Sequence, residues 1–184
     1  MMNKAVFLDR DGVINLDKGY VCRWEDFEFL PGAVDAMRRF SQAGYALIIV
    51  SNQSGIARGY YSESQYQELT SSIEDYLARR GVHLTGVYHC PHHVDGKIKE
   101  LSIHCECRKP APGMLLQAMR DHDLDMAQSI LVGDKISDIQ AAHAAGVGRS
   151  YFVAGEIDLA LQVQPADGVL GSLYECANQL GLTT

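Results

Sequence analysis

Short apolar runs alternate along this chain with longer stretches in which apolar residues recur at helical spacing. The short runs predict buried strands, at 4–9, 45–52, 86–90, 129–134 and 149–154. The longer stretches predict helices, at 32–44, 63–81, 112–123 and 137–146. Three of these helices end in glycine, the residue that most easily adopts a left-handed C-cap. Strands that alternate with helices favour an α/β fold, a three-layer αβα, Rossmann-like arrangement around one parallel sheet.

The length and composition of the chain fit one soluble domain. It has 184 residues, of which 47% are hydrophobic and 21% are charged. The sequence has neither an internal repeat nor an obvious linker, and we expect a single domain over residues 1–184. The formal net charge is −7 and no stretch is strongly basic. A nucleic-acid partner, which is held by clustered Lys and Arg, is therefore not expected.

The N-terminus and the cysteines indicate a cytoplasmic protein. The opening residues "MMNKAVFLDRDG" are too short and too charged for a signal peptide, and no apolar run approaches the length of a membrane span. The chain has five cysteines, an odd number, and three of them crowd between residues 88 and 110. We expect reduced thiols, a monomer and no membrane partner. Cys22 and Cys176 are expected to behave as small hydrophobic residues.

Polar groups follow four of the predicted strands at the point where each strand ends. They are "DRDG" (9–12), "SNQSG" (51–55), a Cys/His-rich stretch that ends in "RKP" (108–110), and "GDKISD" (133–138). Because ligands of parallel α/β sheets bind beyond the carboxyl ends of the strands, these groups predict one site at that edge.

Asp9 and Asp11 are two residues apart at a strand tip, where both carboxylates can face the same crevice. Any single Asp after a strand could be an ordinary turn or N-cap residue. Two neighbouring carboxylates, however, are costly to keep ionised without a cation. We therefore expect Mg²⁺ here, with Asp134 as a further oxygen ligand and with Lys135 and Asp138 as additional candidates.

Lys109 and Ser51 are expected at the same edge. Together with a cation and backbone N–H groups, a lysine and a hydroxyl form a cradle for a phosphate dianion. A free carboxylate beside such a cradle predicts phosphoryl transfer to an aspartate nucleophile.

The Cys/His-rich stretch predicts a second metal site. Cys90-x-His92 and Cys105-x-Cys107 give a Cys₃His set, which is common in closed structural zinc sites. The neighbouring histidines could substitute for His92; they are His89, His93 and His104. Four protein ligands leave no open position for a reacting water, so a zinc ion that shapes the loop at about 88–108 is favoured over a catalytic one.

The order and spacing of D-R-D-G, S-N, R-K-P and G-D-K-x-x-D resemble the four motifs of the haloacid dehalogenase-like phosphatases across most of the chain. By this resemblance Asp9 forms an aspartyl-phosphate, and Asp11 protonates the leaving group and later activates water. Ser51 and Lys109 hold the transferring oxygens. The resemblance assigns Mg²⁺ to Asp9, the backbone carbonyl of Asp11, and Asp134.

The motifs leave no room for the cap domain that many of these phosphatases insert, and the Cys/His loop stands where a cap would be. The chain resembles the uncapped, zinc-loop members, which act on D-glycero-D-manno-heptose 1,7-bisphosphate or on histidinol phosphate. The stretches "NQSGIARGYY" (52–61), "CPHH" (90–93) and "CRKPAPGML" (107–115) favour the heptose substrate and loss of its 7-phosphate, a step toward nucleotide-activated heptose for lipopolysaccharide. The resemblance implies substrate contacts at Asp17, Lys18, Gly19, Tyr20, Asn52, Gln53, Ser54 and Arg108.

Two other classes of protein share some of these features with a phosphatase. A phospho-receiver domain also holds an aspartyl-phosphate, but its nucleophile is expected after a middle strand rather than after the first. A zinc-stabilised nucleic-acid-binding module conflicts with the negative net charge.

Overall fold

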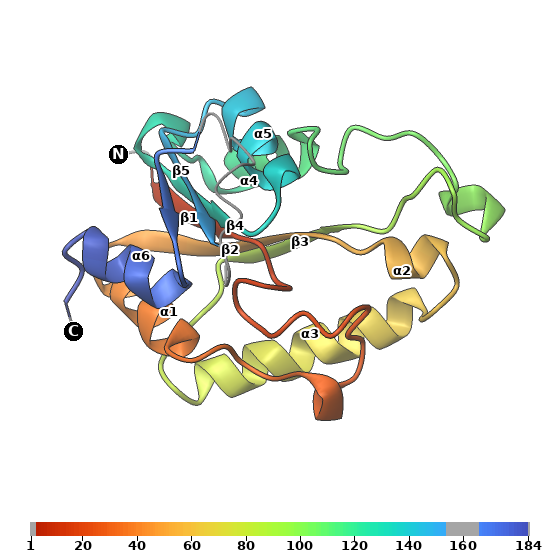
Figure 1. Ribbon diagram of the computed structural model, residues 1–184, viewed down its shortest axis with the longest axis horizontal. Helices are drawn as coiled ribbons and strands as arrows, with labels where there is room; N and C mark the ends of the chain where they lie inside the picture. Colours follow the sequence, from red (N-terminus) through yellow and green to blue (C-terminus); the bar gives the residue numbers. More distant parts are fainter. Residues whose placement is uncertain (1–2, 154–165, 184) are drawn as a thin grey trace.

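The structure, a computed structural model, describes residues 3–153 and 166–183. Within these residues a six-stranded, wholly parallel sheet has the order β3-β2-β1-β4-β5-β6. Its strands are β1 (Lys4–Leu8), β2 (Tyr45–Asn52), β3 (Gly86–Cys90), β4 (Ile130–Gly133), β5 (Arg149–Val153) and β6 (Gly168–Leu170). The strands pack between two layers of helices (Figure 1).

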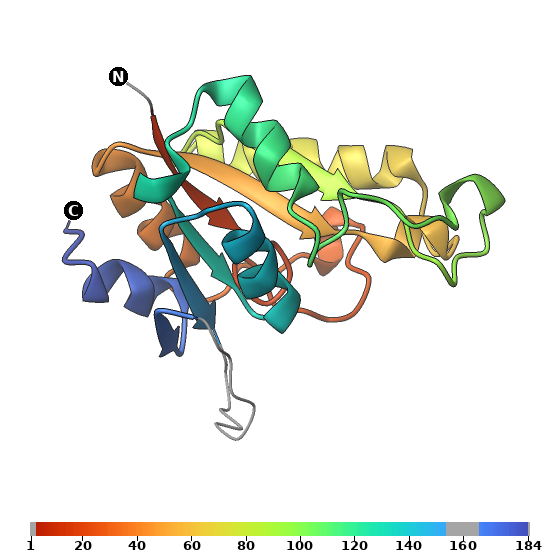
Figure 2. The ribbon, with the colours of Figure 1, turned by 90° about the horizontal axis from the view of Figure 1, so that it is seen from above.

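The described helices cover both faces of the sheet (Figures 1 and 2). The α-helices are α1 (Ala33–Gln42), α2 (Ser54–Ala57), α3 (Glu63–Ala78), α4 (Gly113–His122), α5 (Ile136–Ala144) and α6 (Leu173–Gln179). Short 3₁₀ turns occur at η1 (Trp24–Asp26), η2 (Lys99–Leu101) and η3 (Met126–Gln128). Helices α1, α3 and α6 pack on one face, and α4 and α5 pack on the other.

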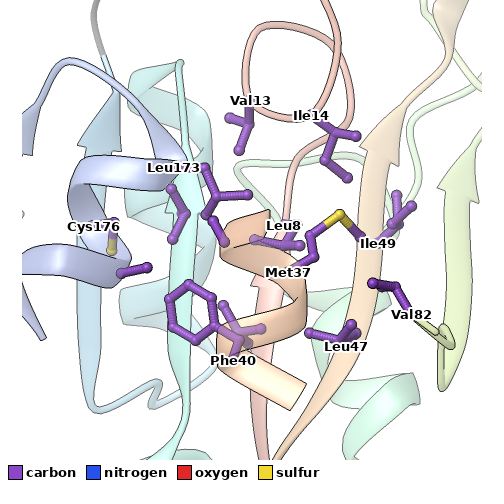
Figure 3. Close-up of a cluster of buried hydrophobic side chains, with 14 of the residues drawn as sticks. Leu8, Val13, Ile14, Met37, Phe40, Leu47, Ile49, Val82, Leu173 and Cys176 are labelled. Atoms are coloured by element: carbon purple, nitrogen blue, oxygen red, sulfur yellow. The ribbon is translucent and has the colours of Figure 1, made fainter. Parts of the chain in front are cut away.

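Each central strand contributes side chains to both hydrophobic layers, because successive side chains of a strand point to opposite faces. Leu8 of β1 packs in the layer that holds Met37 and Phe40 of α1 (Figure 3). The preceding residue, Phe7, packs in the other layer with Leu115 of α4. All five side chains are fully buried, and burial of such a side chain contributes on the order of 2 kcal/mol to folding.

The predicted α/β fold is confirmed, and the predicted elements agree with the structure to within a few residues. Residue 154, the end of the last predicted strand, lies outside the described residues. Apart from the three short 3₁₀ turns, three of the described elements were not predicted, namely α2, β6 and α6. They have four, three and seven residues, which is too short for a clear hydrophobic period.

The register of the sheet brings the predicted site residues together. Strand β1 lies between β2 and β4, with Leu8 paired to Ile49 and to Val132. The chain after β1 therefore emerges beside the ends of both neighbours. The segment that joins β3 to α4 extends beyond this edge beside α2 (Figure 2). Among the described helices, we find none with the length and apolar character needed to cross a membrane.

Candidate active site

Lys109 lies at the centre of the site, and its ammonium group has three partners. Its Nζ lies 2.8 Å from Asp9 Oδ1, pairs with Asp138 Oδ1, and donates to the Val50 carbonyl at 2.7 Å. A lysine ammonium has three donors, so this side chain is fully satisfied and fixed in place. Asp9 follows β1 directly and is only 5% exposed.

Burial and charge act in opposite directions on this group of residues. Burial raises the pKa of Asp9, against the lowering effect of the Lys109 ammonium. Burial also opposes the charge on Lys109, but the carboxylates of Asp9 and Asp138 outweigh it and raise the pKa of the lysine. Lys109 is therefore a permanent cation at neutral pH, buried beside the first strand end.

The backbone of Lys109 is held as firmly as its side chain. The Asn52 carboxamide accepts from the Lys109 N–H and donates to the Lys109 carbonyl, both at 3.0 Å. Asn52 ends β2, so this pair of hydrogen bonds ties the segment after the Cys/His loop directly to the sheet.

Asp134 follows β4 and completes a group of three carboxylates. Oxygens of Asp9, Asp134 and Asp138 lie within 4.8 Å of one another. Asp134 Oδ1 is buried and accepts no hydrogen bond from the described residues; its nearest cation is Lys135 Nζ at 3.5 Å. Burial, and then the charge of Asp9, raise the pKa of Asp134 to about 7. An orphan carboxylate oxygen beside a second carboxylate fits a hard, oxygen-binding cation such as Mg²⁺.

A glycine lets the chain after β1 approach Asp134 this closely. Gly12 has a φ of +90°, and a Cβ at this position would lie 2.3 Å from Asp134 Oδ2. A side chain at residue 12 would therefore be strained and would displace the carboxylate.

Asp11 lines the same pocket as Asp9, together with Ser51, Asn52, Lys109, Lys135, Ser137 and Asp138. Its carboxylate accepts hydrogen bonds from three side chains. Arg10 donates at 2.9 Å, Asn15 at 3.0 Å and Gln53 at 3.1 Å. Arg10 is only 2% exposed. Sequence reasoning missed Arg10 and Asn15, because nothing in the composition of a turn distinguishes a buried arginine from a solvated one.

The loop after the D-R-D-G motif reaches the rim of the site. Asp17 Oδ2 lies 3.7 Å from Lys135 Nζ, and Asp17 Oδ1 accepts from the Gly19 N–H. Tyr20 is 48% exposed and packs edge to face on Tyr60, with 4.6 Å between the ring centroids. The neighbouring Lys18 pairs with Glu28.

The four predicted zinc ligands form one compact group. The Cys90 Sγ lies 3.5 Å from Cys105 Sγ and 3.1 Å from Cys107 Sγ. The His92 Nδ1 lies 3.7 Å from Cys90 Sγ and 3.3 Å from Cys107 Sγ. A tetrahedron with metal–sulfur arms of about 2.3 Å has edges of about 3.8 Å, so the group fits a small tetrahedral ion such as Zn²⁺.

The other histidines of this stretch lie outside the group of four. His89 Nε2 contacts Glu63 at 2.8 Å, and His93 contacts Arg58 at 3.1 Å. His104 does not join the group either. His92 is therefore the histidine that is placed to bind a metal, as the paired spacing predicted.

Basic side chains gather on the loop near Lys109. Arg108 donates to the His92 carbonyl at 3.3 Å, and Arg58 contacts the His93 ring. Partial burial and then the charges of Arg108 and Arg58 lower the pKa of His93. Arg108 and Arg58 are thus two positive groups beside the Cys/His loop, in a chain whose net charge is negative.

Comparisons with known proteins agree with this geometry. Residues 106–176 match the HAD-hydrolase-like family model. The chain is 52% identical over 172 residues to the D-glycero-beta-D-manno-heptose-1,7-bisphosphate 7-phosphatase of Yersinia pestis, covering 93% of this chain and 92% of that one. It is 49% identical to the enzyme of the same name from Escherichia coli K12, covering 93% and 90%.

A solved structure extends the likeness to three dimensions. The D,D-heptose 1,7-bisphosphate phosphatase of B. bronchiseptica, complexed with magnesium and phosphate, superposes with a TM-score of 0.84 at 34% identity. The match covers 96% of this chain and 97% of that one. This chain therefore belongs to the haloacid dehalogenase-like hydrolases and, within them, to the family of the D-glycero-beta-D-manno-heptose-1,7-bisphosphate 7-phosphatases.

Proposed function

We propose that this phosphatase removes the 7-phosphate of D-glycero-D-manno-heptose 1,7-bisphosphate through an aspartyl-phosphate on Asp9. The observation that carries the proposal is the setting of Asp9, which is buried at the end of β1, 2.8 Å from Lys109 Nζ, in a pocket that Asp11 also lines. The relatives that share about half of this sequence are named for that substrate. They are named for its β-anomer, which is therefore the first anomer to test.

In the first step, a carboxylate oxygen of Asp9 attacks phosphorus, and the bond from phosphorus to the sugar oxygen breaks. Asp11 gives its proton to that oxygen, because a sugar alkoxide is a poor leaving group. The Ser51 hydroxyl donates to a phosphoryl oxygen, and the positive charge of Lys109, held beside Asp9, stabilises the negative charge of the phosphoryl group as it redistributes. In the second step water attacks the aspartyl-phosphate, Asp11 takes the proton of the water, and inorganic phosphate leaves Asp9 free.

The residues that would hold Mg²⁺ are Asp9, Asp134 and the backbone carbonyl of Asp11. When bound, Mg²⁺ neutralises charge on these carboxylates and on the phosphoryl group. We assign Asp138 to Lys109 instead, because its Oδ1 contacts the lysine Nζ and its Oδ2 accepts from the Lys135 N–H at 3.0 Å. Lys135, as a cation, is suited to the substrate or to Asp17 rather than to the metal.

The zinc loop would select the substrate, with Zn²⁺ held by Cys90, His92, Cys105 and Cys107. A bisphosphate needs a second anion site, and Arg108 can bind two oxygens through its planar fork. Arg58, which contacts the ring of His93, adds positive charge to the same loop region. The loop after the first motif, with the exposed Tyr20, is a candidate contact for the sugar.

The test is kcat/KM for both anomers of the heptose 1,7-bisphosphate against histidinol phosphate, with the product examined by ³¹P NMR. We expect a preference for the bisphosphate and a product that keeps the phosphate at C1. A preference for histidinol phosphate would overturn the substrate while leaving the aspartate mechanism intact. Stoichiometric labelling of Asp9 without sustained phosphate release would instead indicate a receiver domain. In a cell that makes lipopolysaccharide, the reaction would supply a precursor of nucleotide-activated heptose.

A further inference from the structure

Gln53 lies beneath the pocket rather than on its surface. It follows β2, precedes α2, and is only 2% exposed. Its backbone N–H donates to the Cys90 carbonyl at 2.8 Å, which ties it to the start of the Cys/His loop. The side chain points inward, and every contact recorded for its carboxamide is to another protein side chain.

The surrounding donors fix which way the Gln53 carboxamide points. The Tyr61 hydroxyl donates to Gln53 Oε1, and an Arg10 N–H approaches the same oxygen at 3.4 Å. The opposite end faces the Asp11 carboxylate, which accepts from Gln53 Nε2 at 3.1 Å. Donors on one side and an acceptor on the other allow one amide orientation only.

The same amide nitrogen also contacts Ser51. Gln53 Nε2 donates to Ser51 Oγ at 2.7 Å. Because the Ser51 oxygen accepts this hydrogen bond, its own O–H remains free to donate in another direction. Ser51 lines the pocket, so that direction is available for a phosphoryl oxygen. A single carboxamide thus contacts both the proposed acid/base and a proposed phosphate donor.

Tyr61 is itself held in place by its neighbours. It is 5% exposed and packs with Ile56 and Tyr66. A Cβ on Gly55 would lie 2.2 Å from the Tyr61 ring, so glycine at this position makes room for it. Burial raises the pKa of Tyr61, so the hydroxyl stays protonated and remains a donor. The stretch "NQSGIARGYY" therefore builds one unit in which Gly55 admits Tyr61 and Tyr61 orients Gln53.

We propose that Gln53 is a positioning residue, which sets the Asp11 carboxylate for proton transfer and the Ser51 hydroxyl for phosphate binding, with Tyr61 holding its amide in the required orientation. The inference rests on the proposed function, because it presupposes that Asp11 protonates the leaving group. It also assigns Gln53 an indirect role in place of the direct substrate contact that the family resemblance implies.

The test uses the dependence of kcat/KM on the leaving group, because kcat/KM reports on the first step and not on the hydrolysis step that all substrates share. An alkyl phosphate has a poor leaving group that needs protonation, whereas p-nitrophenyl phosphate has a good leaving group that does not. We expect Gln53→Met to lower kcat/KM by about 10²-fold for an alkyl phosphate and by about 10-fold or less for p-nitrophenyl phosphate. Tyr61→Phe removes the hydroxyl that donates to Gln53 Oε1. It should lower kcat/KM for the alkyl phosphate by about 3- to 10-fold, with a smaller loss for p-nitrophenyl phosphate.

Matched controls separate positioning from general damage to the fold. Gln67→Met and Tyr76→Phe make the same changes in α3, away from the pocket, and should leave both rates unchanged. Equal losses for the two substrates in Gln53→Met and in Tyr61→Phe would overturn the inference, as would unchanged rates. If Asp11→Asn is selective for the alkyl phosphate and the Gln53 and Tyr61 variants are not, the inference alone fails. If Asp11→Asn is not selective, the proposed acid role fails.

Discussion

At the scale of residues, the buried ion pair between Asp9 and Lys109 is central to the proposed chemistry. The lysine lowers the pKa of Asp9 against the raising effect of burial, and the lysine itself is kept charged by two carboxylates. Burial of charge is costly, and the loss of one partner of such a pair commonly costs 3–5 kcal/mol because the other charge stays unpaired. Asp138 limits this cost for Lys109, because it remains as a second partner when Asp9 is changed.

The first prediction follows from this arrangement. Asp9→Asn should lower kcat by at least about 10³-fold, because the amide cannot form the covalent intermediate. The fold should survive, because Lys109 keeps Asp138 and the Val50 carbonyl as partners. Steady-state kinetics and far-UV circular dichroism check the two halves. A variant that is folded and fully active would show that Asp9 is not the nucleophile.

Cys176 allows a prediction for stability in alkali. Burial in the core raises the pKa of its thiol to about 12, whereas an unfolded cysteine titrates at about 8.5. Between these values the unfolded chain holds fewer protons than the folded one. The free energy of unfolding should therefore fall as the pH rises above about 9, by up to about 1.4 kcal/mol per pH unit from this group.

Urea unfolding at pH 8 and pH 10 checks this, with Cys176→Ala as the comparison. The variant should be less stable at pH 8 by about 1 kcal/mol, owing to lost packing, but should lose less stability between the two pH values. Because other groups titrate equally in both proteins, only the difference between the slopes reports on Cys176. Equal slopes would contradict the prediction.

At the scale of elements, the Cys/His loop connects the proposed zinc site to the pocket around Lys109. Cys107 lies two residues before Lys109, and the Cys90 carbonyl accepts from the backbone of Gln53. The loop is therefore attached to the pocket at both of its ends. Gly113 also lets the start of α4 lie close to the end of the loop, since a Cβ at this position would lie 2.2 Å from the Glu106 carbonyl oxygen.

Loss of a zinc ligand should impair substrate binding more than chemistry. We expect Cys105→Ser to lose its zinc and to raise KM for the heptose bisphosphate by about 10-fold, because the loop that carries Arg108 would no longer be held in shape by the metal. The rate with p-nitrophenyl phosphate, which does not need the loop for recognition, should change less. Metal analysis and parallel kinetics with both substrates check this, and Cys176→Ala should keep its zinc. Unchanged specificity in a folded, zinc-free variant would limit the loop to a role in stability.

The sequence predicted well those features that depend on period and spacing. The strand ends brought Asp9, Asp134 and Asp138 together as expected, and the C-x-H and C-x-C pairs brought four ligands together. It did not predict the network around Asp11, because that network joins Arg10 with Gln53 and Tyr61 across the sequence. Hydrogen-bond partners of this kind depend on side-chain direction, which a single sequence does not encode in any local pattern.

At the scale of the whole molecule, the same strands contribute side chains to both hydrophobic layers. Alternate residues of β1 and β2 enter opposite layers, so neither layer can come apart without disrupting the strands of the other. We therefore expect residues 1–184 to unfold as a single unit when the metal sites are saturated.

The single tryptophan reports on this expectation. Trp24 packs against Phe27 and Tyr76, in the group that joins the long loop after β1 to α3. Its fluorescence and the far-UV circular dichroism signal should give the same midpoint in urea. Two separate midpoints would indicate two independently stable parts and would contradict a single domain.

The pairing of Asn52 with Lys109 also limits how the length of this chain can vary in evolution or in design. The Asn52 carboxamide contacts both backbone groups of Lys109 and so fixes the position of this residue relative to β2. The number of residues between Lys109 and Cys107 must therefore suit that position. The tip at 93–104 is held mainly through backbone contacts to Ala57 and within itself. Insertions in the tip should therefore be tolerated and could change substrate specificity, whereas a single residue added after Cys107 should separate Lys109 from Asp9.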